Sequence, residues 1–186
     1  AYGALGYRGY ENPSFLSTPG AKDVGIEFYT FSKTFNMAGW RLAFAAGNDQ
    51  MIEALNLIQD HLFVGIFPAL QEAGIAALLD PKSEEAVAQL NANYDSRRDA
   101  FVQVAAKIGW KAFPSKGSFY AWMPVPEGYT SESFADLLLE KAHVAVAPGK
   151  GFGPAGDAYV RIGLLVEPER LVEAVGRIAN LQLFNN

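Results

Sequence analysis

The sequence predicts an α/β protein, in which a layered α/β sheet is followed by a smaller α+β domain. Two short runs, residues 24 to 31 and 42 to 46, are apolar on both alternating faces, which is typical of strands buried on both sides of a sheet. Apolar residues then recur at helical spacing as far as Gly109. Beyond it, short strand-like runs alternate with helical stretches, which indicates the α+β part.

Three helices are predicted between the second strand and Gly109. Asp49 can cap the first, the second covers residues 70 to 79, and Gly109 terminates the third and longest. The residues that recur at helical spacing are Met51, Leu55, Ile58 and Leu62 in the first helix and Val87, Leu90, Tyr94, Phe101 and Ile108 in the third. We place the domain boundary at Asp80-Pro81, so that the domains are residues 1 to 80 and 81 to 186.

The second domain is predicted to mix strands with helices. Four short apolar runs resemble strands: residues 110 to 113, 118 to 125, 144 to 147 and 159 to 166. A helix is expected over about 131 to 142. Pro168 suits the first turn of a final helix, because proline is favoured there. The residues expected to face inward in this last helix are Leu171, Val175 and Ile178.

Composition places the chain among ordinary globular proteins and excludes several functions. Of the 186 residues, 50% are hydrophobic and 19% are charged, a balance that predicts folding rather than disorder. The formal net charge of -5 provides no broad basic face for a phosphate backbone, so nucleic acid is not an expected partner. The absence of cysteine excludes disulfides, thiolate catalysis and cysteine metal sites.

No segment has the pattern of a membrane anchor or a signal peptide. No apolar stretch reaches the roughly 18 to 20 residues that a membrane helix needs, and the first residues lack a basic start followed by an apolar run. We therefore expect a cytoplasmic protein with no membrane partner. His61 and His143 are isolated in the sequence, so we assign them no catalytic role and predict no metal site.

The residues with the clearest chemical meaning lie at positions 30 to 43, which read TFSKTFNMAGWRLA. Lys33 directly follows a predicted buried strand, where partial desolvation favours the neutral, nucleophilic amine that can form an imine. Arg41 offers a planar fork of donors that suits a phosphate. Gly39 allows the loop between them to fold back, so that one small molecule can touch both side chains. Pyridoxal phosphate carries the aldehyde and the phosphate that this pair predicts.

This stretch resembles the cofactor attachment site of class I aminotransferases, in which an arginine follows the lysine after eight positions. The family's pattern is matched at Phe31, Ser32, Lys33, Asn36, Met37, Gly39, Arg41, Leu42 and Ala43. Thr30 departs from the usual serine or glycine but keeps a hydroxyl for a phosphate contact. The resemblance implies that Lys33 holds pyridoxal 5'-phosphate as a Schiff base, with Thr30, Ser32 and Arg41 as cofactor contacts. It also implies fold type I: the end of a large PLP-binding domain with an α/β/α sheet, then a small C-terminal domain.

The resemblance extends along the whole chain and implies further site residues. Tyr2 follows Ala1 as in the family's Asp-x-Ala-Tyr element, whose tyrosine hydrogen-bonds the ring oxygen of the cofactor. Arg161 lies in an apolar strand-like run, where a buried guanidinium needs an anionic partner, and the matching arginine of the family clamps the substrate α-carboxylate. Phe152 is expected to line the substrate pocket.

Three other patterns receive simpler interpretations. Residues 148 to 156, PGKGFGPAG, lack the Gly-Lys-Ser/Thr ending of a P-loop and are interpreted as a loop beside the substrate-binding strand. The charged residues of the long helix are expected to form a solvated, mutually paired face: Asp95, Arg97, Arg98 and Asp99. The aromatic residues expected to serve strand packing are Phe119, Tyr120 and Trp122.

The resemblance implies an enzyme that moves an amino group between an amino acid and a 2-oxo acid, with Lys33 as general base and then general acid. The family's enzymes are longer and are expected to be homodimers, and they hold the pyridine nitrogen with an aspartate two residues before the position of Ala1. We therefore expect this chain to be the C-terminal portion of such an enzyme and to be poorly active alone.

Two alternatives remain open from the sequence. One is a lyase or decarboxylase of the same fold, since related scaffolds redirect the same carbanion chemistry. The other is a non-catalytic sensor domain, as in a transcription regulator that retains the fold. The segment GWRLAFAAGN resembles the alanine, diaminopimelate and methionine or aromatic branches of the family, and the sequence does not choose the amino donor among them.

Overall fold

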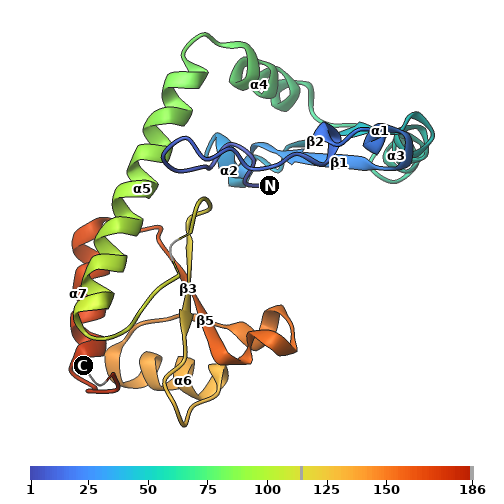
Figure 1. The fold of residues 1–186 in the computed structure, drawn as a ribbon. Coiled ribbons are helices and arrows are strands. Elements are labelled where there is room, and N and C mark those ends of the chain that lie inside the picture. Colours follow the sequence, from blue (N-terminus) through green and yellow to red (C-terminus); the bar gives the residue numbers. More distant parts are fainter. Residues whose placement is uncertain (114, 185–186) are drawn as a thin grey trace. The chain divides into compact units, whose positions relative to one another are not determined.

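The computed structural model describes residues 1–113 and 115–184, and it has the α/β class that the sequence predicts (Figure 1). The chain forms two compact units, Ala1–Asn91 and Ala92–Asn186. They divide inside the longest helix, α5 (Ser83–Lys107). The domain division predicted between residues 80 and 81 stays a prediction.

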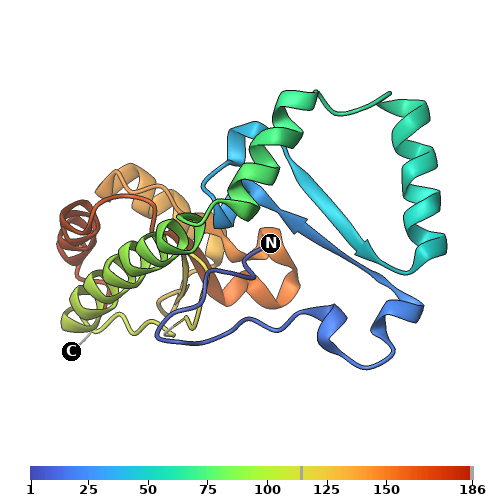
Figure 2. The same ribbon diagram turned by 90° about the horizontal axis from the view of Figure 1, so that it is seen from above.

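The first unit is built on two antiparallel strands, β1 (Ile26–Thr30) and β2 (Ala43–Gly47), which confirm the two strands predicted in this region. The register pairs Thr30 with Ala43 at one end and Ile26 with Gly47 at the other. Figure 2 shows the strands side by side as a ribbon, with the short α2 (Phe31–Thr34) at one end and α3 (Asp49–Leu62) beyond the other.

Burial on both faces of this ribbon, which the sequence pattern indicated, is wrong. The Phe28 side chain is 59% exposed and that of Phe44 is 43% exposed. Phe28 pairs with Ala45, so Phe44 points to the opposite face of the ribbon. An apolar run therefore predicts which faces a strand offers for burial, and not what covers them.

The remaining elements of the first unit are helical. The turns η1 (Phe15–Ser17) and α1 (Ala21–Val24) precede β1, η2 (Ala38–Trp40) lies between the strands, and α4 (Pro68–Leu79) follows α3. The cap of α3 is Asn48 and not the predicted Asp49: the Asn48 side chain accepts a hydrogen bond from the Met51 N–H at 3.1 Å. Both residues are good caps, and the backbone places Asp49 inside the helix.

The second unit holds a three-stranded antiparallel sheet in the order β3-β5-β4. Its strands are β3 (Tyr120–Pro124), β4 (Ala147–Pro148) and β5 (Tyr159–Gly163). Arg161 lies in the central strand, where it pairs with Trp122 on one side and Ala147 on the other. The predicted strand over residues 118 to 125 is confirmed in its central part, and the one over 159 to 166 is confirmed in its first five residues, 159 to 163.

The other two strands predicted for this unit are wrong in whole or in part. The described residues of 110 to 113 form no strand: the Trp110 side chain is 1% exposed, and its Nε1 donates to the Pro124 carbonyl at 2.7 Å. Its ring, rather than its backbone, joins this segment to β3. Of residues 144 to 147 only Ala147 enters the sheet, because the Val144 N–H still donates to the Leu138 carbonyl of the preceding helix (3.1 Å).

Three helices cover one face of this sheet: α5, α7 (Pro168–Ala179), and α6 (Ser131–Leu137) with its π-helical continuation η3 (Leu138–Ala142). They confirm the helices predicted here, and Gly109 ends the α5 segment with φ +82°. The buried core includes Met123, Phe134, Leu138, Val160, Leu171, Val175 and Ile178. Within the described residues, no helix combines the length and apolar character that crossing a membrane requires.

Candidate active site

Residues 31 to 42 form a loop that joins β1 to β2 and carries both Lys33 and Arg41. Beyond the last strand pair, the Phe31 N–H donates to the Leu42 carbonyl at 3.2 Å, which closes the loop. Phe31 and Leu42 are also buried, at 3% and 6% exposure. The hairpin therefore brings the predicted lysine and arginine into one closed loop at one end of the ribbon.

Thr30 caps the helical turn on which Lys33 lies. Its Oγ1 accepts a hydrogen bond from the Ser32 N–H at 3.2 Å and donates one to the Ser32 Oγ at 2.9 Å. A threonine at a helix N-cap satisfies a backbone donor that has no partner within the helix. The two predicted hydroxyl contacts are therefore paired with each other at the start of the lysine turn.

Lys33 and Arg41 differ in exposure. Lys33 is half-buried in the last turn of α2, between the buried side chains of Phe31 and Thr34. Arg41 is exposed, and its Nη1 donates to the Ala38 carbonyl at 3.0 Å, which ties the guanidinium to its own loop. An amine that is partly removed from water can react with a carbonyl carbon. A guanidinium on the same loop can bind an anion.

The chain reversal inside this loop comes from Asn36 and Arg41 rather than from Gly39. Both residues have left-handed backbones, with φ +54° and +55°, a conformation that costs a non-glycine residue about 1 kcal/mol. Gly39 lies in η2 without a left-handed φ. The prediction that Gly39 allows the loop to fold back is therefore corrected. Strained positions of this kind persist where the surrounding structure holds them.

Helix α4 packs against the base of the loop through Gly74. A Cβ atom at this position would lie 2.7 Å from Leu42 Cδ2 and 3.3 Å from Phe31 Cζ. Because position 74 has no side chain, the helix lies close to the two residues that close the loop without displacing their side chains. The lysine loop is thus supported from the strands and from α4.

Tyr2 lies in a separate turn of the first unit. The Leu5 N–H donates to the Tyr2 carbonyl (2.9 Å), and Nδ2 of Asn12 donates to the same oxygen (3.0 Å). Nδ2 of Asn91, on α5, donates to the Ala4 carbonyl at 2.7 Å. The backbone of Tyr2 is therefore fixed from two sides, and its ring is half-buried.

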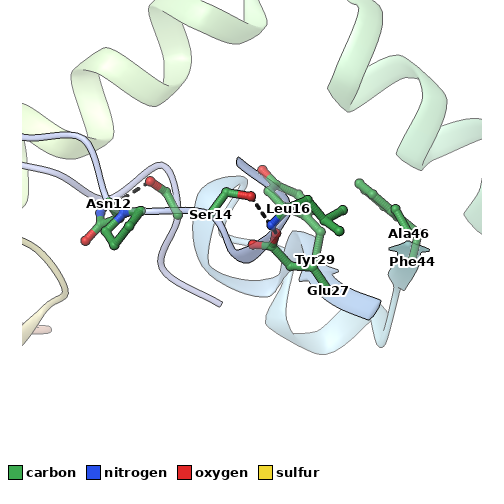
Figure 3. A pocket seen from close by; sticks show the side chains of 9 residues that line it. Asn12, Ser14, Leu16, Glu27, Tyr29, Phe44 and Ala46 are labelled. Atoms are coloured by element: carbon green, nitrogen blue, oxygen red, sulfur yellow. Dashed lines mark hydrogen bonds between the residues drawn. The ribbon is translucent and has the colours of Figure 1, made fainter. Parts of the chain in front are cut away.

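A hollow of about 330 Å³ lies beside the ribbon and contains none of the predicted site residues (Figure 3). Its carboxylate, Glu27, accepts hydrogen bonds from the Ser14 hydroxyl (2.5 Å) and the Leu16 N–H (3.1 Å). These two bonds, the hydroxyl first, lower the pKa of Glu27 from its usual 4.5. Glu27 thus anchors the N-terminal segment to β1.

The Glu27 anchor predicts a pH-dependent contribution to stability. Because its pKa is lowered in the folded chain, the contribution is complete above about pH 4.5 and is lost as the pH falls through the folded-state pKa. We expect Glu27→Gln to raise hydrogen–deuterium exchange in residues 12 to 18 at pH 7, and the variant and parent to converge in acid. Equal exchange at pH 7 would rule out this anchor. Glu84→Gln, on α5, is the matched control.

Arg161 lies in the second unit, half-buried on the sheet face opposite the helices. Its guanidinium carbon is 4.1 Å from the ring centroid of Tyr120 and 4.2 Å from that of Phe152. Val160 and Ile162, its neighbours along β5, point into the core. Alternation along the strand therefore turns Arg161 out of the core and toward two aromatic rings.

Phe152 is the last residue of the short 3-10 helix η4 (Gly149–Phe152), which is followed by a second one, η5 (Pro154–Ala158). Both lie beside β5, as the sequence indicated. Ser131 joins them to α6: its Oγ donates to the Asp157 carboxylate at 2.8 Å and accepts from the Lys150 N–H at 3.3 Å. The Ser131 bonds lower the pKa of Asp157. Lys150 Nζ pairs with the exposed Glu132 at 2.7 Å.

Close backbone packing fixes the same loop at Gly149. A Cβ atom at this position would lie 2.2 Å from the Gly156 carbonyl oxygen and 2.5 Å from that of Tyr159. We expect Gly149→Ala to lower the free energy of unfolding by about 3 kcal/mol in chemical denaturation, since the backbone must shift to admit it. Gly151→Ala is the control, because nothing lies within 4 Å of its Cβ position. Equal unfolding free energies for the two variants would contradict the close packing.

Arg98 corrects the expectation of a solvated charged face on α5. It is 7% exposed, forms ion pairs with Asp95 and Asp99, and donates from Nη1 to the Ser115 carbonyl at 3.2 Å. Arg97 pairs with Glu167 at the start of α7. Buried arginine requires such pairing. Charge spacing along one helix predicts pairing within it, but not the loop that covers it.

The predicted site residues therefore form two groups. Lys33, Arg41 and Ser32 lie in one loop of the first unit, and Thr30 is the last residue of the strand that leads into it. Tyr2 lies in a separate turn of that unit. Arg161 and Phe152 contact each other in the second unit. Tyr120 is a neighbour of Arg161 that the sequence does not predict. The only signal for it was the alternation of Tyr120 and Trp122, which does not reveal the strand opposite.

This fold recurs in solved transaminase structures. Apo-BacF from Bacillus subtilis matches with a TM-score of 0.94 and 46% identity, over 100% of this chain and 47% of that chain. Two named relatives are similar in sequence. L-glutamine–4-(methylsulfanyl)-2-oxobutanoate aminotransferase of Bacillus subtilis is 59% identical over 99% of this chain, and LL-diaminopimelate aminotransferase of Moorella thermoacetica is 48% identical over 96%.

The sequence profile of the family described as aminotransferase class I and II matches residues 1–178. The chain belongs to this family, as the lysine segment predicted. It spans 46% of the length of the Bacillus relative and 45% of the Moorella relative, so about half of each.

Proposed function

We propose that these residues work within a pyridoxal-phosphate-dependent aminotransferase, which moves an amino group between an amino acid and a 2-oxo acid. The observation that carries the proposal is the closed loop that holds Lys33 and Arg41 together after β1. Membership of the aminotransferase family and the names of the relatives support it. The chain covers about half of the length of those relatives, so the activity of the whole enzyme is part of the proposal.

The donor set of the lysine loop fits pyridoxal 5'-phosphate. The half-buried amine of Lys33 suits its aldehyde, and the exposed guanidinium of Arg41 with the paired hydroxyls of Thr30 and Ser32 suits its phosphate. Tyr2 is proposed to hydrogen-bond the ring oxygen. When bound, the cofactor supplies an electron-withdrawing ring that stabilises negative charge at the substrate α-carbon.

Lys33 is proposed to be the group that moves the proton. Its Nζ takes the proton from the substrate α-carbon and would return it to the carbon bound on the other side of the amino nitrogen, as general base and then general acid. The burial of Phe31 and Thr34 on either side holds the turn that carries it. A fixed turn keeps the amine within reach of both carbons, which is what a two-step proton transfer requires.

Arg161 is proposed to bind the α-carboxylate of the amino acid and of the 2-oxo acid. Its guanidinium contacts aromatic rings, which leave its N–H groups available for two parallel hydrogen bonds to a carboxylate. Phe152, next to it, is proposed to line the substrate pocket.

The assembly is proposed to be a cytoplasmic homodimer. Large apolar side chains at the surface of the first unit support a partner surface, and they include Leu57, Ile58, Leu62, Phe63 and Phe67. Apolar exposure on this scale marks surfaces that become covered.

An amino-transfer assay of the full-length enzyme that carries this sequence tests the proposal. Glutamine with 4-(methylsulfanyl)-2-oxobutanoate is the first pair to use, because the relative with that name is 59% identical. Diaminopimelate, alanine and aromatic donors complete the panel. We expect conversion of at least one donor to its oxo acid, dependent on added pyridoxal phosphate, and little turnover by the 186-residue chain alone. No transfer with any pair, or decarboxylation alone, would exclude the proposal.

A further inference from the structure

Two aromatic rings from different elements meet the guanidinium of Arg161. Tyr120 approaches from β3 and Phe152 from η4, with the guanidinium carbon 4.1 Å and 4.2 Å from the two ring centroids. We propose that Tyr120 and Phe152 are positioning residues, which set the pose in which Arg161 binds the substrate carboxylate. This inference rests on the proposed function of Arg161.

The sheet register explains why Tyr120 can reach the cation. Trp122 lies directly opposite Arg161, and Tyr120 lies opposite Gly163. Tyr120 is thus the diagonal neighbour of Arg161 on the same face, within reach of long side chains. A Cβ atom at Gly163 would lie 3.9 Å from Tyr120 Cε1, an ordinary van der Waals contact, so the Tyr120 ring lies close to Gly163. The register of β3 and β5 therefore places this ring within reach of the Arg161 guanidinium.

Both rings are themselves held in place. Tyr120 contacts the ring of Phe119 (4.9 Å between centroids), and buried Phe119 contacts Tyr94 of α5 (5.2 Å). Phe152 meets Trp122 edge to face at 5.9 Å. Its turn is fixed by the close packing at Gly149 and by the Ser131 bonds. Two anchored rings therefore restrain a side chain that otherwise has many rotamers.

The charge of Arg161 is not neutralised within the described part of the chain. There its partners are the two rings, and no carboxylate pairs with it. The face of an aromatic ring attracts the cation, but it does not accept the pair of N–H hydrogen bonds that a carboxylate accepts. The full positive charge and the N–H edge therefore remain for a ligand, while the contacts set the orientation of the planar group. Lysine lacks such a plane, so it cannot replace arginine here.

Substitution of Tyr120 tests the inference in the full-length enzyme. We expect Tyr120→Leu to raise KM for the amino acid and the 2-oxo acid by about 3- to 30-fold, the range of a cation–π contact, with kcat nearly unchanged. Tyr120→Phe keeps the ring and is expected to retain the parent KM. Phe113→Leu is the matched control, because Phe113 is an exposed aromatic residue whose ring contacts Tyr159 instead. Thermal melting of each variant verifies folding.

A double-mutant cycle separates this inference from the proposed function. If Tyr120 acts through Arg161, Tyr120→Leu adds no further rise in KM once Arg161→Leu is present. The positioning role is overturned if Tyr120→Leu leaves KM unchanged, or if it raises KM by the same factor in the parent and in Arg161→Leu. Either result leaves the proposed function of Arg161 intact. An unchanged KM in Arg161→Leu itself overturns the proposed carboxylate site. A loss of kcat without a change in KM assigns Tyr120 a different task and also rejects the inference.

Discussion

Replacing Lys33 by alanine is expected to lower kcat for amino transfer by roughly 10⁴-fold, the upper range for loss of a general acid–base group. The expectation follows from the place of Lys33, half-buried on a capped turn inside a closed loop. No other lysine lies in that loop between residues 31 and 42. Without the amine, no group of the loop can take and return the proton at the substrate α-carbon.

Steady-state kinetics of the full-length Lys33→Ala variant provide the measurement. Lys22→Ala is the control, because Lys22 is an exposed lysine on α1, outside the loop. Its kcat is expected to match the parent. A small external amine is expected to restore part of the rate to Lys33→Ala, since the missing group is an amine. A Lys33→Ala variant within tenfold of the parent kcat would show that Lys33 is not the proton carrier.

Replacing Arg161 by leucine is expected to raise KM for both substrates by about 10- to 100-fold, the range of a charge-assisted hydrogen-bonded contact. The guanidinium lies on the open face of the sheet, and its described neighbours are aromatic rings rather than acids. Arg161→Lys keeps the charge but loses the planar fork, so it is expected to recover only a small part of the affinity.

Parallel measurements with Arg177→Leu provide the control for charge removal. Arg177 lies on α7 and pairs with Glu173 at the surface, so KM is expected to stay at the parent value. An Arg161→Lys variant with full affinity would indicate that charge alone binds the substrate. An Arg161→Leu variant with parent KM would place the carboxylate elsewhere.

Local signals account for what the sequence predicted correctly. The segment from Thr30 to Arg41 predicted the family correctly, because the family's pattern consists of residue types at fixed spacing along the chain. Gly109 and Pro168 mark helix boundaries because glycine readily adopts the left-handed backbone at a helix end and proline fits the first helical turn. The stripe of Leu171, Val175 and Ile178 follows from helical periodicity alone, and all three are buried.

Contacts between distant segments account for what the sequence could not predict. Strand formation at residues 110 to 113 depends on pairing with another strand. The indole N–H of Trp110 instead donates a hydrogen bond to the Pro124 carbonyl. Burial of Arg98 depends on the loop at Ser115, and the contact of Tyr120 with Arg161 depends on strand register. The exposure of Phe28 depends on which elements pack over the two strands. The alternation of side chains along a strand does not reveal those elements.

Chemical trapping of the cofactor tests whether Lys33 holds pyridoxal phosphate. The full-length enzyme is incubated with pyridoxal phosphate, reduced with borohydride and digested, and the labelled peptide is mapped by mass spectrometry. We expect one label per chain, on Lys33, and none on the corresponding peptide of Lys33→Ala. A label on another lysine, such as Lys150, or a label spread over exposed lysines, would contradict this expectation.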